Sequence, residues 1–94
     1  MAQTATINIP TTVWTQLTDA DVTSITFQNR GAYPLLVKAT DNATAPDNTE
    51  GAILYNPAQG ERNVLMSDLF PGIDSPVRLW GYCFGQISVS VSHA

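Results

Sequence analysis

The chain has 94 residues, of which 44% are hydrophobic and 13% charged, and its formal net charge at pH 7 is −4. This length predicts a single domain over residues 1–94, because chains divide into separate domains only beyond about 250 residues. The few basic side chains argue against a nucleic-acid partner, and the absence of a long apolar run argues against a membrane partner.

The predicted elements are strands throughout the chain. Short runs of β-branched and aromatic residues recur between clusters of Pro, Gly, Asn and Asp, and no stretch has the apolar spacing of an amphipathic helix. In chain order we predict strands over residues 4–9, 12–17 (short), 22–29, 33–40, 51–56, 61–66, 76–84 and 85–93. The pattern indicates an all-β fold, a small antiparallel β-sandwich or a jelly-roll-like barrel of seven or eight short strands.

Two pairs of these strands are predicted to form hairpins. Asn29 and Gly31 both tolerate positive φ, so strands 22–29 and 33–40 are expected to pair across the connection NRGAYP. The last two strands, 76–84 and 85–93, are expected to pair for a similar reason, because Gly81 and Gly85 lie around their junction.

The side chains that alternate inward along the strands are predicted to form the core. This core contains Ile7, Ile9, Ile25, Phe27, Leu35, Val37, Ile53, Val64, Val77, Leu79, Ile87, Val89 and Val91.

Two longer connections separate the strands. Residues 39–51 are polar, acidic and interrupted by proline, which predicts an exposed excursion. Residues 67–76 begin with Ser67 and Asp68 as candidate caps of one helical turn, which Pro71 and Gly72 would end. The apolar residues of that connection, Leu69, Phe70 and Ile73, either close one end of the core or anchor a neighbouring subunit.

The side chains that carry most enzyme chemistry do not form a recognisable pattern, so we expect no enzyme, no catalytic residues and no cofactor. The one histidine, His93, has no second histidine with which to share a metal. Cys83 lies among aromatic residues in the sequence and is predicted to be a small, buried hydrophobic side chain. Oxygen donors gather in the acidic excursion at Asp41, Asn42, Asp47, Asn48 and Glu50. Their spacing is not that of a calcium loop, because Pro46 interrupts it. We therefore expect no metal.

Aromatic residues offer an alternative to catalysis. Exposed rings could form a platform on which a sugar stacks, although burial of most of them in the core competes with that interpretation. The candidates are Trp14, Tyr33, Tyr55, Trp80 and Tyr82. Trp80 and Tyr82 share one face of their strand and are candidate interface residues, as is Phe70.

The last strand, residues 85–93, is a further candidate interface. Ile87, Val89 and Val91 alternate with Ser88, Ser90 and Ser92, so one face would be buried and the other would present small hydroxyls. We expect this strand to lie at a sheet edge, where another chain could add a strand.

Three stretches together resemble small structural proteins of tailed bacteriophages and related gene-transfer agents. They are TTVWTQLTDADVTSITFQNRG, GAILYNPAQGERNVLMSDLFPG and VRLWGYCFGQISVSVSHA, which cover most of the chain. Such proteins include head decoration or cement proteins, head-spike bases and fibre-associated modules, and the group has no shared active site.

The resemblance implies a structural component of the virion, made in the host cytoplasm, since the start MAQTATINIP lacks the pattern of a signal peptide. The implied function is capsid decoration, in which the chain binds the major capsid protein or other virion proteins and stabilises the assembled head. A homo-oligomer, with a trimer favoured, would suit binding around a local symmetry axis. The alternative is a carbohydrate-binding or attachment module of a head spike or tail fibre.

Overall fold

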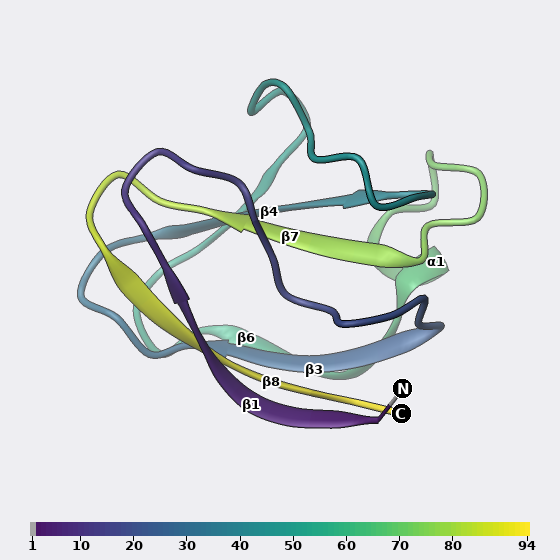
Figure 1. Ribbon diagram of the computed structural model, residues 1–94, viewed down its shortest axis with the longest axis horizontal. Coiled ribbons are helices and arrows are strands. Elements are labelled where there is room, and N and C mark those ends of the chain that lie inside the picture. Colours follow the sequence, from purple (N-terminus) through teal and green to yellow (C-terminus); the bar gives the residue numbers. More distant parts are fainter. Residues whose placement is uncertain (1) are drawn as a thin grey trace.

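Two antiparallel sheets of four strands face each other in the computed structural model, which describes residues 2–94 (Figure 1). Sheet A has the order β1 (Gln3–Ile9), β8 (Ile87–His93), β3 (Ser24–Asn29) and β6 (Gly60–Leu65). Sheet B has the order β2 (Thr15–Gln16), β7 (Arg78–Tyr82), β4 (Leu35–Thr40) and β5 (Ile53–Tyr55). One helical turn, α1 (Met66–Leu69), follows β6. The predicted all-β sandwich is confirmed, and the two sheets do not close into a barrel.

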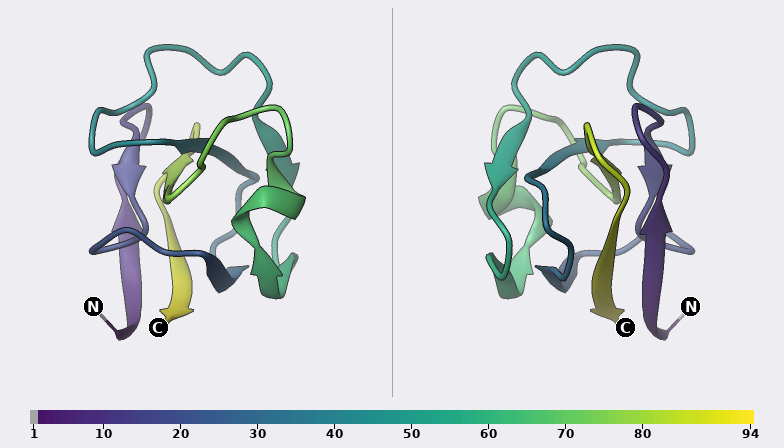
Figure 2. Two further views of the ribbon diagram at one scale, coloured as in Figure 1. Left: turned by 90° about the vertical axis from the view of Figure 1, so that its right-hand side faces the viewer. Right: turned by 90° about the vertical axis from the view of Figure 1, so that its left-hand side faces the viewer.

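The order of the strands is that of a jelly roll. β1 lies beside β8, β2 beside β7, β3 beside β6 and β4 beside β5, as if a long antiparallel ribbon had been folded across itself. Six of the seven connections between consecutive strands therefore pass from one sheet to the other, and only β4 and β5 are consecutive and paired. Both ends of the described chain lie at the same end of sheet A, where Gln3 is opposite His93 (Figures 1 and 2).

Both hairpin predictions are wrong. β3 belongs to sheet A and β4 to sheet B, and β7 and β8 are divided in the same way. The buried side chain of Asn29 holds the first of these crossovers in place. Its Nδ2 donates to the carbonyls of Tyr33 (2.8 Å) and Tyr55 (3.1 Å), and its Oδ1 accepts from the backbone N–H of Gly31 (2.9 Å). Asn29 thus provides hydrogen-bond partners for three backbone groups at the crossover, one of them on β5.

The core lies between the sheets and follows the predicted alternation. Nine of the predicted core residues are buried: Ile9, Ile25, Phe27, Leu35, Val37, Leu79, Ile87, Val89 and Val91. Three more, Ile7, Ile53 and Val64, are half-buried and pack against that cluster. Val77 is half-buried and lies outside the cluster, because β7 begins one residue after it. Residues not predicted for the core but buried in it include Leu17, Val22, Ala39 and Met66.

The connection after β6 closes one end of the core, as one of the two interpretations of residues 67–76 predicted. Phe70 belongs to the buried cluster, and Leu69 and Ile73 pack against it. The helical turn starts earlier than predicted, at Met66, and the preceding residue has an apolar side chain with no capping group. Ser67 and Asp68 are exposed within the turn and do not cap it.

The last strand is not at an edge. β8 lies between β1 and β3; it pairs with β1 over all seven residues and with β3 from Val89 to Ser92, so both of its sides are occupied in the sheet. The expectation that another chain adds a strand to β8 is therefore wrong. The edges of the two sheets are instead β1, β6, β2 and β5.

Candidate protein-binding surface

The candidate interface residues lie in three separate places. Ser88, Ser90 and Ser92 are half-buried on the outer face of sheet A, Trp80 and Tyr82 are on the outer face of sheet B, and Phe70 is in the core. The fold therefore does not gather them into one site. A side chain such as Phe70, with 9% of its surface exposed, offers little area to a partner.

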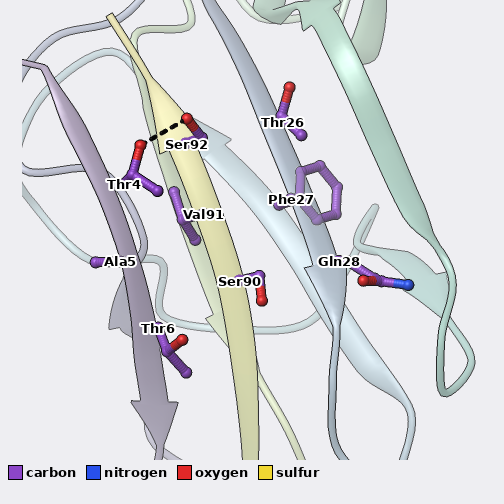
Figure 3. Close-up of a pocket in the computed structure, with 9 residues that line it drawn as sticks. All are labelled: Thr4, Ala5, Thr6, Thr26, Phe27, Gln28, Ser90, Val91 and Ser92. Carbon is purple, nitrogen blue, oxygen red and sulfur yellow. Dashed lines mark hydrogen bonds between the residues drawn. The ribbon is translucent and has the colours of Figure 1, made fainter.

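The serines belong to a regular array of short polar side chains. Ser92 lies between Thr4 on β1 and Thr26 on β3, and Ser90 lies between Thr6 and Gln28 in the next row. The hydroxyls of Thr4 and Ser92 are 3.0 Å apart and share a hydrogen bond, and these rows line a shallow depression (Figure 3). The side chains of these rows on the outer face are polar, and most of them are short.

Trp80 is buried although it points away from the core. Only 6% of its surface is exposed, and it lies between Lys38 on β4 and Gln16 on β2. Its Nε1 donates to the hydroxyl of Thr40 at 2.8 Å. The acidic excursion after β4 folds back over this face, where Asn48 accepts from the ammonium of Lys38. A sugar platform that includes Trp80 is therefore wrong, because its ring is covered.

Three other aromatic rings meet at the end of β7. The ring of Tyr82 lies 4.9 Å from that of Trp14 and 5.4 Å from that of Phe84, measured between centroids, and both contacts are inclined rather than stacked. Tilted and edge-on contacts of this kind are favourable arrangements for aromatic pairs. Phe84 is 68% exposed, although it belongs to this cluster.

Other apolar side chains are next to these residues in the sequence or across the sheet. Tyr33, which is 52% exposed, covers Gly85: a Cβ at that glycine would lie 2.5 Å from the tyrosine ring. Val13 precedes Trp14 and is 50% exposed. Across the sheet, Tyr82 pairs with Leu36, which pairs in turn with the exposed Leu54 of β5. We call this surface the aromatic patch; it consists of Val13, Trp14, Tyr33, Leu36, Leu54, Tyr82 and Phe84.

The aromatic patch is uncharged, and four of its members, Val13, Tyr33, Leu54 and Phe84, are at least half exposed. None of its seven side chains carries a formal charge, in a chain with four basic and eight acidic residues. Interface cores are depleted in charged residues and enriched in aromatic ones. The patch therefore has the composition of the centre of a protein interface.

Of two main contributors to the patch, Phe84 was not predicted as a binding residue, and Tyr33 was predicted only as a candidate of the sugar platform. Both were assigned to the ends of predicted strands, but β7 ends at Tyr82 and β4 begins at Leu35. The alternation of β7 carried a usable signal: Leu79, Gly81 and Cys83 point inward, so Tyr82 and Phe84 must point outward.

Three titratable side chains, those of Cys83, His93 and Tyr55, are buried in the sandwich. Cys83 is fully buried, as predicted for a small hydrophobe, and burial raises the pKa of its thiol, which disfavours the nucleophilic thiolate. The buried imidazole of His93 lies 3.3 Å from the carboxylate of Asp19. The hydroxyl of Tyr55 donates to Glu61 at 3.0 Å.

Within residues 2–94 no three acidic, histidine or cysteine side chains come together in a way that could hold a metal ion. Two side-chain oxygens of the acidic excursion instead accept backbone N–H groups of the same loop. The Oδ1 of Asn42 accepts from the N–H of Thr44, and that of Asn48 accepts from the N–H of Glu50. These contacts are typical of Asx turns.

The described part of the chain contains no helix long and apolar enough to cross a membrane. No protein-family model, no curated protein and no solved structure matches this chain.

Proposed function

We propose that this chain is a structural virion protein of a tailed phage, a capsid decoration or cement protein that binds the assembled head shell. The observation that carries the proposal is the aromatic patch, an exposed and uncharged apolar surface with three rings in contact. A surface of this kind is costly to leave in water and is favourable to cover with another protein.

The fold supports the proposal by analogy. Jelly rolls with two packed sheets recur in viral shell proteins and also in lectins. A fold does not determine a function, so this analogy only adds weight to what the patch indicates. The sheets provide a rigid support, because the rings of the patch are attached to β7 and to short connections held by paired strands.

Stabilisation of a shell by this chain would follow from mass action. A ligand that binds only the assembled lattice lowers the free energy of that lattice and leaves the free subunits unchanged. Phe84 and Tyr33 would enter the contact between neighbouring shell subunits, while the polar surroundings of the patch would remain at the rim.

A second candidate is a carbohydrate-binding module of a head spike or tail fibre. The inclined rings of Trp14, Tyr82 and Phe84 favour it, since aromatic faces also bind sugars. The burial of Trp80 removes one of the two tryptophan rings from that platform, and for this reason we favour a protein partner.

The copy number of the chain in purified particles tests the proposal. We expect the molar ratio of this chain to the major shell protein, measured from their gel bands, to be of the order of one. A decoration protein repeats with the lattice of the shell. A ratio far below one would favour the spike or fibre alternative. Absence of the chain from purified particles would overturn the virion proposal.

A second measurement tests the requirement for assembly. Purified chain is added to shells that lack it, to the unassembled shell protein and to a glycan array. Binding to assembled shells alone is the expected result, whereas binding to glycans alone would contradict capsid decoration and support the second candidate.

A further inference from the structure

The four edge strands of the sandwich differ in how well they are protected against pairing with another strand. Proteins protect edges by making them short, or with charges, prolines and bulges. β5 has three residues and β2 has two, so neither offers a long ladder. β6 carries Glu61 and Arg62, and its pairing with β3 shifts in register where Asn63 has a φ of 48°.

β1 has none of these protections. Its seven residues, QTATINI, contain no charge, no proline and no glycine, and all seven pair with β8 in one unbroken register. At about 3.4 Å per residue the seven residues offer an open edge about 24 Å long. Pro10 comes only after the strand has ended.

Incomplete burial on the inner side of β1 shows that its edge is open. Val89 and Val91 on β8 are buried, but Ile7 and Ala5, which lie directly opposite them, are only half-buried. A neighbour at this edge would cover Ile7 further.

We propose that β1 pairs with β1 of a second copy of this chain, in an antiparallel and two-fold symmetric contact that joins the two A sheets. Full overlap of Gln3–Ile9 with its symmetry mate places the two-fold axis at Thr6. In this register Ala5 lies opposite Ile7 of the second copy on the inner face. On the outer face Thr4 lies opposite Asn8, and Thr6 lies opposite its own mate.

The faces of the two copies match in this arrangement. The outer side chains Thr4, Thr6 and Asn8 are polar and exposed, so the hydroxyl rows of the two A sheets continue across the contact. Ala5 and Ile7 meet as an apolar pair, and the free backbone groups of each β1 gain partners. No like charges oppose each other, because the strand has none.

The contact is narrow, so we expect a reversible association. An edge-to-edge contact of seven residues buries less than the roughly 800 Å² per partner of a stable interface. Its symmetry produces dimers and not the trimer that the resemblance to phage proteins implies. The inference is independent of the proposed function, since it requires no shell.

Sedimentation equilibrium of the whole chain, from micromolar to millimolar concentration, tests the inference. We expect the wild type to shift from monomer to dimer within this range. Thr6→Lys and Thr6→Glu should each remain monomeric, because two like charges would meet at the two-fold axis. An equimolar mixture of these two variants should form dimers again, which also shows that both are folded.

Ser90→Lys is the matched control. Ser90 lies beside Thr6 on the same outer face but one strand further from the edge, so the lysine there should leave dimerisation unchanged. A wild type that remains monomeric at millimolar concentration, or that forms trimers, would overturn the proposal. Dimerisation of Thr6→Lys equal to that of the wild type would overturn it as well.

Discussion

Val89 lies at the centre of sheet A, on the middle strand β8, with its side chain fully buried between the sheets. Truncation of such a side chain removes apolar contacts and leaves a cavity that the surrounding strands fill only in part. We therefore expect Val89→Ala to lower the free energy of unfolding by about 1–3 kcal/mol, measured by chemical denaturation. Ser90→Ala, on the outer face of the same strand, should change it by less than about 0.5 kcal/mol. Equal midpoints for the wild type and Val89→Ala would contradict the register of β8.

Tyr55 connects the protonation of a side chain to stability. Burial raises the pKa of its phenol above the usual value, and the hydrogen bond to Glu61 and the negative charge of that carboxylate raise it further. Because the pKa of Tyr55 is higher in the folded than in the unfolded chain, the contribution of its protonated phenol to the free energy of unfolding is complete below about pH 10. This contribution declines as the pH rises further.

The variant Tyr55→Phe should therefore weaken the dependence of stability on pH in the alkaline range. Thermal unfolding measured at increasing pH should show a smaller decrease in melting temperature above about pH 10 for Tyr55→Phe than for the wild type. Identical slopes for the wild type and Tyr55→Phe would mean that the pKa of the Tyr55 phenol is the same in the folded and the unfolded chain.

At the scale of elements, the crossover from β3 to β4 depends on Asn29. Its buried amide bonds three backbone groups, and an alanine there would leave buried groups without partners. We expect Asn29→Ala to lower the free energy of unfolding by about 1–3 kcal/mol or more. Gln28→Ala is the control, because that amide also donates to a carbonyl, that of Ala58, but at an exposed position. A similarly small effect of both variants would show that Asn29 does not hold the crossover.

The strands were predictable from the sequence, but their partners were not. The alternation of Ile87, Val89 and Val91 with serine depends on which side faces the core, and that periodicity is local. Whether a short connection returns the chain to the same sheet or carries it to the other depends on contacts that are distant in sequence, such as Asn29 with Tyr55. A glycine near the connection fits either outcome.

The candidate surface was predictable only in part, for the same reason. Tyr82 and Trp14 were identified as aromatic candidates, yet their contact with each other joins β7 to the segment before β2, which lies far away in the chain. Trp80 is on the same face as Tyr82 but is covered by neighbours from β2 and β4 and by the returning excursion. Exposure of an aromatic ring is thus a property of the assembled sandwich.

At the scale of the whole molecule, the sandwich separates three kinds of surface. The outer face of sheet A is a flat array of short polar side chains, the edge at β1 is an open and uncharged ladder, and the end of β7 has the aromatic patch. Only the patch combines exposed apolar area with rings fixed against each other. For this reason the patch is the surface to which we assign the proposed contact with a protein shell.

Retention of a patch variant in assembled particles tests this account most directly. Phe84→Ser removes the most exposed ring of the patch, and Leu65→Ser removes a similarly apolar side chain, 50% exposed, on β6 of the other sheet. Neither side chain belongs to the buried core, so both variants should fold as the wild type does. We predict that particles assembled with Phe84→Ser lose most copies of the chain, while those with Leu65→Ser keep the wild-type number. Particles that retain Phe84→Ser at the wild-type copy number would contradict the assignment of the patch as the interface.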